Sequence, residues 1–332
     1  MPTPTAPVTL YRDPAIFERE RETIFARTWQ FLGLEADFGR TGDYLADTFA
    51  GYPVVVVRDE TGVLRGFHNV CRHRAGPLVA DAKGRCDRAL VCQFHSWRYG
   101  FDGRLLDASG FDPADGYDPA ALGLFPIRVE TWRGFVFVNL DAGAAPLADS
   151  LQPLDERLGI QIARPARVRD RHPVACNWKV LVENYLDGFH RDGVHAAPGA
   201  GAGAHRHPVH LHGDVAVYQN SFPGGGVESL WAWVWPNLGL SLHRGVLTVE
   251  SFRPEGPDRT VIDHVFLHEP EDPSVEVAIL SAERVTEEDT WICERVQQNL
   301  DAGAYQTGWL SPSHEQAVAS FQGRVSAALA PF

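Results

Sequence analysis

The pattern of apolar and polar residues begins as that of a helix. Asp13 followed by Pro14 predicts a helix start, because aspartate caps a helix and proline fits its first position. Residues 14–32 then repeat large apolar side chains at helical spacing. The expected inward positions are Ile16, Phe17, Ile24, Phe25 and Trp29. We expect the residues before this helix, 1–10, to form a loose tail.

From about residue 38 the pattern becomes that of short strands. Three runs of alternating or wholly apolar residues, 52–71, 96–106 and 124–141, each contain a turn signal. The second of these runs has Asp-Gly between apolar flanks, which is typical of a hairpin. We therefore expect an all-β domain over residues 38–145.

The second half of the chain mixes helices and strands. Residues 177–190, 284–301 and 312–330 have helical patterns. Four segments alternate or run apolar like antiparallel strands: 214–222, 230–243, 246–254 and 259–270. The expected fold class is α+β, because a large antiparallel sheet would pack against helices. The all-β domain would then be inserted in a second domain formed by residues 1–37 and 146–332.

Composition and charge limit the classes of function. The chain has 332 residues, 44% hydrophobic and 22% charged, as expected for a globular protein. Its net charge of −13 argues against a nucleic-acid partner, which needs a basic face. We expect no membrane span and no secretory signal, because no long apolar run occurs. Five scattered cysteines predict a reducing, cytoplasmic location without a disulfide framework.

The first candidate metal site pairs cysteine with histidine twice. Cys71 and His73 are followed, after eighteen residues, by Cys92 and His95. Two thiolates and two imidazoles hold either a zinc ion or a Rieske [2Fe–2S] cluster, in which the cysteines bind one iron and the histidines the other. A zinc finger usually takes both cysteines from one turn and both histidines from a helix. Here each turn offers one of each, which favours the cluster over zinc.

The segment 187-DGFHRDGVH-195 offers a second candidate metal site. Asp187 and His190 share one face of the predicted helix, whereas His195 lies about 140° further round. Both histidines face one ion only if the helix bends or ends, which Gly188 and Gly193 facilitate. Two imidazoles and a carboxylate from elsewhere form the facial triad of an O₂-activating ferrous site. The alternative is two polar histidines at a helix end, and it is weaker beside a redox cluster.

The metal motifs carry a resemblance to a known family. The segments 69-NVCRHRAGPL-78, 91-VCQFHSWRYGFDGRL-105 and 177-NWKVLVENYLDGFHRDGVH-195 resemble the alpha (oxygenase) subunit of Rieske-type non-haem iron oxygenases. The resemblance covers nearly the whole chain and is closest to the choline- and betaine-type members. One departure is Ser96, where the family usually has glycine.

The resemblance also implies roles for individual residues. His190 and His195 would bind a mononuclear Fe(II) in the second, catalytic domain, and Asp187 would bridge to a histidine of the cluster. The third iron ligand is expected in the segment 283–300, where we choose Asp289. The reserve candidates are Glu287 and Glu288. Their alternative role is to stabilise a helix N-terminus by charge.

The partners are likewise implied by resemblance. Electrons would come from a separate NAD(P)H-dependent flavin and iron–sulfur reductase, either directly or through a ferredoxin, and O₂ would be the co-substrate. The chain has no GxGxxG unit for a dinucleotide of its own. A homotrimer is implied, in which the cluster of one subunit serves the iron of its neighbour.

The substrate is the least specified part of the prediction. The family resemblance favours hydroxylation or oxidative demethylation of a small organic substrate such as a quaternary or methylated amine. Trp231, Trp233 and Trp235 share one strand face and would form a cation–π wall, unless they belong to the core. The competing reading is hydroxylation or O-demethylation of an aromatic compound, with Arg206 or Arg244 binding a carboxylate.

Two further readings stay open. The chain could be a Rieske electron carrier whose second site is inactive. Four closely spaced histidines are interpreted as part of a polar loop over the pocket, with substrate contact as the alternative. They are His205, His207, His210 and His212.

Overall fold

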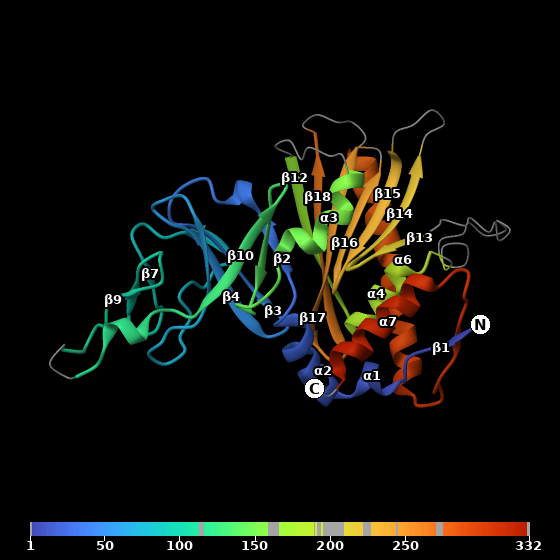
Figure 1. Ribbon diagram of the computed structural model, residues 1–332, viewed down its shortest axis with the longest axis horizontal. Coiled ribbons are helices and arrows are strands. Elements are labelled where there is room, and N and C mark those ends of the chain that lie inside the picture. The colour runs from blue at the N-terminus through green and yellow to red at the C-terminus, as the bar shows by residue number, and fades with distance from the viewer. Residues whose placement is uncertain are drawn as a thin grey trace. The chain divides into compact units, whose positions relative to one another are not determined.

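The computed structural model divides into two compact units, whose elements are labelled in Figure 1. The β unit comprises residues 25–148, and the helix–sheet unit comprises residues 1–24 and 149–332. An all-β unit and a unit with helices on a large antiparallel sheet confirm the predicted α+β fold class. The structure describes residues 2–112, 116–158, 166–188, 190, 194, 209–221, 227–243, 245–269 and 275–330.

The β unit is built on antiparallel strands. They are β2 (Gln30–Leu34), β3 (Asp43–Phe49), β4 (Tyr52–Arg58), β5 (Leu64–His68), β6 (Lys83–Arg85), β7 (Leu90–Val91), β8 (Arg98–Tyr99), β9 (Leu105–Asp107), β10 (Pro126–Trp132) and β11 (Phe135–Asn139). Seven of them form one sheet in the order β2-β11-β10-β5-β4-β3-β6, and β7-β8-β9 form a small second sheet. The three predicted hairpins are confirmed as β4–β5, β8–β9 and β10–β11. Short helical turns η2 (Glu35–Asp37) and η4 (Pro119–Leu122) connect strands.

The helix predicted over 14–32 is wrong beyond Phe25. The residues that follow form β2, which pairs with β11 at the edge of the sheet. Phe31 meets Phe135 and Phe137 edge to face, with ring centroids 5.5 and 5.8 Å apart. All of β2 is buried, and a strand pairing that buries this much apolar surface outweighs local helix propensity. The β unit therefore begins at residue 25 and not at residue 38.

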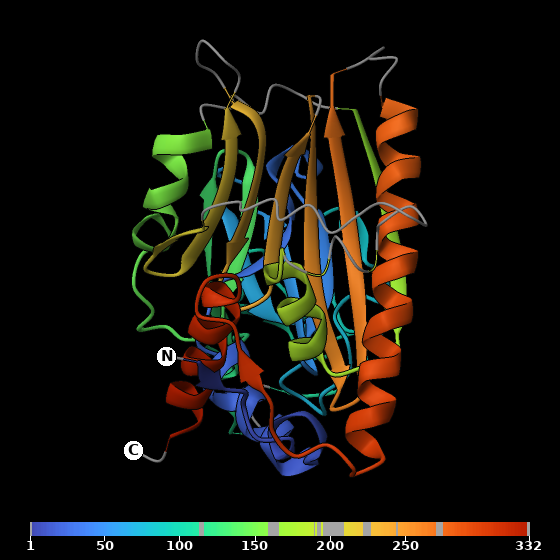
Figure 2. The same ribbon diagram turned by 90° about the vertical axis from the view of Figure 1, so that its right-hand side faces the viewer.

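The helix–sheet unit contains one large antiparallel sheet, seen in Figure 2. Its order is β12-β18-β17-β16-β15-β14-β13. The strands predicted between 214 and 270 are confirmed, except that the single segment 230–243 forms parts of two paired strands, β15 and β16. The strands are β12 (Ala166–Val174), β13 (Val209–His212), β14 (Val215–Ser221), β15 (Val227–Val234), β16 (Leu238–His243), β17 (Val246–Gly256) and β18 (Arg259–His268). The polar loop predicted for His210 and His212 is wrong, because both lie exposed on the edge strand β13.

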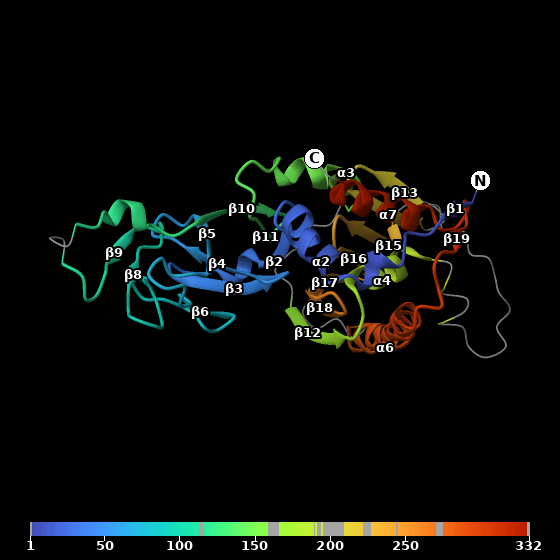
Figure 3. The same cartoon turned by 90° about the horizontal axis from the view of Figure 1, so that it is seen from below.

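Within the part of the chain that the structure describes, six α-helices accompany the sheet. They are α1 (Thr9–Arg12), α2 (Pro14–Glu20), α3 (Leu147–Leu158), α4 (Trp178–Leu186), α6 (Val275–Asp301) and α7 (Gln316–Leu329), with a π-helical turn η1 (Arg21–Phe25) after α2. Figure 3 shows α4 between α6 and α7, and α4 contacts both of these helices. The two closing helices are confirmed, but the first begins at Val275 and not at residue 284. Within the described residues, no helix is long and apolar enough to cross a membrane.

The N-terminal segment is held in place, so the predicted loose tail is wrong. The strand β1 (Thr3–Pro4) pairs with β19 (Trp309–Leu310). The N–H of Ala6 donates to Oε1 of Gln322 on α7 at 2.8 Å. In this segment α1 contacts α6 and α2 contacts α7, and both α6 and α7 also contact α4, the helix that leads into the second metal motif.

Candidate metal centres

The first loop of the cysteine–histidine motif is a tight backbone turn. The N–H of Cys71 donates to the carbonyl of Gly76 at 2.8 Å, and the carbonyl of Cys71 accepts from the N–H of Ala75 at 3.0 Å. The N–H of His73 points at the Cys71 sulfur, 3.5 Å away. Ala75 adopts a left-handed conformation, with φ of 56°. The turn thus presents the thiol and the imidazole from one side of the loop.

The second loop repeats this geometry. The N–H of Cys92 donates to the carbonyl of Trp97 at 2.8 Å, and its carbonyl accepts from the N–H of Ser96 at 3.1 Å. The N–H of Phe94 points at the Cys92 sulfur at 3.5 Å. Ser96 is left-handed as well, with φ of 60°. The glycine that the family usually has at this position is thereby explained, because glycine adopts positive φ without steric cost.

The two loops face each other closely. The rings of His73 and His95 are 4.7 Å apart between centroids, and a Cβ added to Gly76 would lie 2.9 Å from the Cys92 sulfur. Nδ1 of His73 is buried and has no hydrogen-bond partner among the described residues. Desolvation, together with His73 and Arg74, lowers the pKa of His95 and favours the neutral imidazole that binds metals. Both loops therefore fit a [2Fe–2S] cluster between them.

Two aromatic residues support the first loop. The ring of His73 stacks on Trp97 with centroids 4.8 Å apart and planes 9° from parallel. The hydroxyl oxygen of Tyr99 lies 3.2 Å from the Cys71 sulfur and accepts from the N–H of Arg72 at 3.1 Å. The supporting role of Tyr99 was not predicted from the sequence. Its place two residues after Trp97, at the spacing of alternating side chains, was the available signal.

The second motif lies at the end of α4. The side chain of Asn177 caps the start of the helix by accepting from the N–H two residues on, at 3.0 Å. The last carbonyl, that of Leu186, accepts from the hydroxyl of Tyr218 at 2.6 Å. Asp187 then leaves the helix with φ of −88° and ψ of 93°. The helix predicted to continue to residue 190 therefore ends earlier, because the sheet takes its terminal carbonyl.

This early end brings His190 to α6. Its Nε2 is 3.4 Å from Oδ1 of Asp289, and its Nδ1 is 3.9 Å from Oδ2 of Asp187. Nδ1 also contacts the carbonyl oxygen of Asp187. Burial acts to lower the pKa of His190, but the two carboxylates outweigh it and raise this pKa. An imidazole and a carboxylate from separate elements thus meet where the sequence predicts an iron site.

Asp289 lies well inside α6 and not near its start. Helix α6 begins at Val275, so a role for Glu287 and Glu288 in stabilising a helix N-terminus is wrong. Glu288 accepts from Arg284 at 3.1 Å, and Glu287 is exposed. Among the described residues, no third His, Cys, Asp or Glu side chain joins His190 and Asp289 in a group that could hold a single metal ion. The candidates that lie outside the described residues are His195, His205, Arg206, His207 and Arg244.

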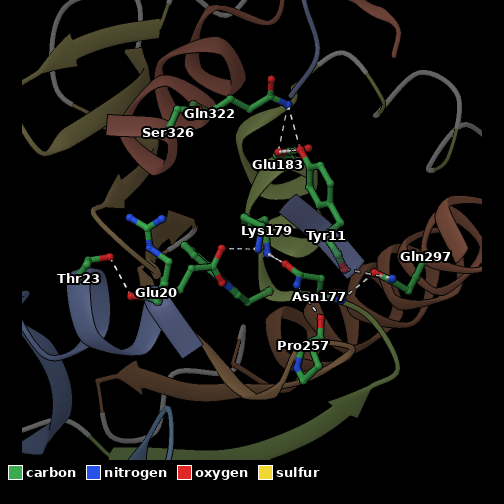
Figure 4. Close-up of polar contacts among 12 residues, drawn as sticks. Tyr11, Glu20, Thr23, Asn177, Lys179, Glu183, Pro257, Gln297, Gln322 and Ser326 are labelled. Carbon is green, nitrogen blue, oxygen red and sulfur yellow. Dashed lines mark hydrogen bonds and ion pairs between the residues drawn. The ribbon is translucent and has the colours of Figure 1, made fainter. Parts of the chain in front are cut away.

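A buried polar network supports α4 from below, as Figure 4 shows. Nζ of Lys179 donates to Oε1 of Glu20 at 2.6 Å, and Nε1 of Trp178 donates to the other carboxylate oxygen at 2.8 Å. The ammonium and the carboxylate are both almost fully buried. The ion pair therefore joins α2 to the first turn of α4. The apolar pattern of the sequence gives no signal of this pair.

The network continues one turn further along α4. Glu183 accepts from the hydroxyl of Tyr11 at 2.5 Å and from Nε2 of Gln322 at 3.1 Å. Burial raises the pKa of Glu183 to about 7, although these hydrogen bonds and Lys179 act to lower it. A carboxylic acid that is half protonated near pH 7 thus lies one helical turn before Asp187.

The three tryptophans divide between core and site. Trp233 and Trp235 pack against Phe321 of α7, with ring centroids 5.6 and 6.0 Å away, so the core interpretation is correct for these two. Trp231 is the cross-strand partner of Tyr218 and is partly accessible. The hydroxyl of Tyr218 donates to the carbonyl of Leu186, so the pair of Tyr218 and Trp231 lies next to the end of α4.

Comparisons with known proteins agree with both centres. A family model described as “Rieske [2Fe-2S] domain” matches residues 28–118. One described as “Ring hydroxylating alpha subunit (catalytic domain)” matches residues 163–221 and 223–330.

Individual relatives are similar over most of the chain or over part of it. The chloroplastic choline monooxygenase of Spinacia oleracea is 28% identical over 329 residues, covering 92% of this chain and 73% of the relative. The glycine betaine monooxygenase oxygenase subunit of Chromohalobacter salexigens is 36% identical over 195 residues, covering 57% and 42%. The structure of a quaternary ammonium Rieske monooxygenase, described in terms of carnitine oxidation and inter-subunit electron transfer, has a TM-score of 0.85 at 25% identity, covering 99% of this chain and 96% of that one.

Proposed function

The chain belongs to the ring-hydroxylating alpha subunits of the Rieske-type oxygenases, and from that premise we propose that it oxidises a quaternary or methylated amine. It takes a Rieske [2Fe–2S] cluster and a mononuclear iron as cofactors. When bound, the cluster supplies single electrons and the ferrous iron activates O₂. The products would be a hydroxylated amine, or a demethylated amine and formaldehyde.

The β unit would hold the cluster through its two facing loops. Cys71 and Cys92 would bind one iron, and His73 and His95 the other. The repeated backbone turns and the 4.7 Å approach of the two imidazole rings support this assignment. The buried Nδ1 of His73 supports it further, because a buried imidazole nitrogen needs a partner.

The helix–sheet unit would hold the ferrous iron through His190, His195 and Asp289. The 3.4 Å approach of His190 to Asp289 supports two of these three ligands. Asp187 would act as the bridge by accepting a hydrogen bond from a cluster histidine of a neighbouring subunit. Its place at the helix end, with a fifth of its side chain exposed, leaves it open to such a contact. A homotrimer would supply the neighbour, as the similarity to an enzyme with inter-subunit electron transfer supports.

Oxygenases of this family receive electrons from a separate protein and use O₂. For this chain we propose an NAD(P)H-dependent flavin and iron–sulfur reductase, with or without a ferredoxin, in the cytoplasm. Five free thiols fit that reducing location.

The cross-strand pair of Tyr218 and Trp231 is the observation that favours an amine as the substrate. Both side chains lie on the sheet face next to α4 and stay partly accessible. Burial, together with Asp187, raises the pKa of Tyr218 to well above 10, so the phenol is neutral at pH 7. Neutral aromatic faces attract a quaternary ammonium with about 0.5–2 kcal/mol each. The choline and betaine enzymes among the similar proteins are named for substrates of this class.

A peroxide-driven turnover of the iron-loaded protein tests this proposal without its reductase. The substrates would be choline, glycine betaine, a dimethylamine, an aromatic acid and a methoxy-aromatic, read by mass spectrometry. We expect oxidation of the amines only. We expect Trp231→Leu to raise KM for the amines about tenfold, and Trp309→Leu, at an exposed tryptophan of β19, to leave KM unchanged. Oxidation of the aromatic compounds alone would contradict the amine assignment.

A further inference from the structure

A row of ionisable side chains crosses the large sheet away from the metal motifs. Asp170 of β12 pairs with His264 of β18, and His264 pairs with Glu250 of β17. The next cross-strand position is Gly239 of β16. Paired residues in adjacent strands point to the same face. Three ionisable groups therefore line up from the edge strand into the middle of the sheet.

The row passes from solvent to the interior. Asp170 and its neighbour His172 keep 42% and 31% of their side chains exposed, and His172 Nε2 is 2.7 Å from an Asp170 oxygen. The rings of His172 and His264 are 5.5 Å apart between centroids. His264 is 3% exposed, and its Nε2 is 3.6 Å from Oε2 of Glu250. One water molecule is enough to connect neighbouring polar groups of the row that lie beyond direct hydrogen-bond distance.

The inner end of the row reaches helix α4. In the fully described run 246–254, every residue is buried except Glu250, which keeps 19% of its side chain exposed. The ring of Tyr185 fills the space over Gly239, where an added Cβ would lie 2.7 Å from the tyrosine Cζ. The charge of Glu250 contributes to raising the pKa of the Tyr185 phenol, after burial. Tyr185 belongs to α4, two residues before Asp187, so the row ends against the helix that leads into the iron motif.

His264 has the properties of a proton carrier. Its Nδ1 is buried without a hydrogen-bond partner among the described residues, while Nε2 faces a carboxylate. Burial acts to lower its pKa, but Glu250, Asp170 and Asp263 outweigh it and raise this pKa. Phe266 of its own strand stacks on the ring at 5.7 Å and adds no charge. An imidazole beside a carboxylate can both accept and release a proton.

We propose that Asp170, His172, His264 and Glu250 form the path that delivers protons to the oxygenase site. Hydroxylation of a methyl group consumes one O₂, two electrons and two protons. The C–H bond and the O–O bond break, one oxygen atom enters the substrate, and the other leaves as water. The electrons come from the reductase, and the protons come from solvent. The proposal rests on the proposed function in needing an oxygenase, but the proton demand is the same for amine and aromatic hydroxylation.

Substitution of the two inner groups tests the path. We expect His264→Gln and Glu250→Gln to slow reductase-driven product formation at least about tenfold, within the range for a lost proton-transfer group. The solvent deuterium isotope effect on turnover should increase, and added imidazole should partly restore the rate of His264→Gln. Iron content and the spectrum of the reduced cluster should not change. Glu255→Gln, at a carboxylate of the same strand that pairs with exposed Arg259, is the matched control.

A purely structural ion pair predicts a different result. The variants would then lose thermal stability or iron, while the isotope effect stayed at its wild-type value, and the proposal would be overturned. An NMR titration of His264 provides a readout that needs no turnover. We expect its pKa to fall in Glu250→Gln. If wild type oxidises aromatic compounds and no amine, only the substrate proposal fails, and the proton path is then tested with the aromatic substrate.

Discussion

In each cluster loop, one residue in a strained backbone conformation makes the tight turn. Ser96 and Ala75 occupy equivalent left-handed positions in the two loops, with φ of 60° and 56°. For a residue with a Cβ this conformation costs about 1 kcal/mol. The loops keep it because it turns the chain back after each histidine.

Replacing Ser96 by glycine should therefore stabilise the protein. We expect Ser96→Gly to raise the free energy of unfolding by about 0.5–1 kcal/mol, since the relief of strain exceeds the added chain entropy. Thermal unfolding of the cluster-loaded protein measures the change. Ala142→Gly, at an exposed turn residue without positive φ, is the control and should be neutral or destabilising. A lower melting temperature for Ser96→Gly would contradict the conformational reading.

Glu183 should make stability depend on pH in a defined direction. Its folded pKa of about 7 exceeds its unfolded value of 4.5. Between these pH values the folded state holds a proton that the unfolded state has lost, so stability falls as pH rises through this window. We expect the free energy of unfolding of wild type to fall by up to about 3 kcal/mol between pH 5 and pH 8. Glu183→Gln should not show this fall. Denaturant unfolding at several pH values measures it, with Glu276→Gln as the exposed control. An unchanged slope would show that Glu183 ionises normally.

At the scale of elements, the Lys179–Glu20 pair fixes α4 against α2. Removal of one partner leaves the other charge buried and uncompensated, which costs about 3–5 kcal/mol. We expect this loss in Lys179→Met, and a clearly smaller loss in the double variant Lys179→Met with Glu20→Gln. Urea unfolding of wild type, Lys179→Met, Glu20→Gln and the double variant gives the coupling energy between the two side chains. For the exposed Arg259–Glu255 pair, Arg259→Met should cost less than about 1 kcal/mol. Equal losses in single and double variants would contradict the pairing.

Some helices and strands could be predicted from the sequence, and others could not. Hairpins such as β10–β11 were predictable, because turn residues and alternating side chains are local signals. The ends of α4 and of the N-terminal helix were not, because each is decided by a distant partner. Tyr218 takes the last carbonyl of α4, and β11 recruits residues that could continue a helix.

Some residues of the candidate site could likewise be predicted from the sequence, and others could not. The spacing of the motifs predicts the cluster residues and His190 as ligands, and the structure brings His73 close to His95 and His190 close to Asp289. Asp289 was placed from the resemblance, and its position inside a helix of 27 residues was missed. The supporting residues Tyr99, Glu183 and Lys179 were missed as well. Their roles arise from tertiary contacts that no local pattern encodes.

At the scale of the whole molecule, the proposed trimer lets the cluster of one subunit serve the iron of its neighbour. We expect a variant without a cluster, His95→Ala, and a variant without iron, His190→Ala, each to be inactive alone. Their co-expression should restore reductase-driven turnover, because mixed trimers pair an intact cluster with an intact iron. Addition of Asp187→Ala to the His95→Ala chain should abolish the recovery. Mixed trimers that stay inactive would indicate electron transfer within one chain.

We propose that electrons stored in the β unit are used for O₂ chemistry on an amine in the helix–sheet unit. A single turnover tests it directly, with fully loaded protein reduced beforehand, freed of reductant, and mixed with choline or glycine betaine under ¹⁸O₂. We predict one labelled oxygen in the hydroxylated product, or in formaldehyde that is trapped before its oxygen exchanges with water, with oxidation of the cluster at the same rate. Asp187→Asn should keep both metals and slow the two events together. Cluster oxidation without any hydroxylated or demethylated amine would contradict the proposed electron transfer.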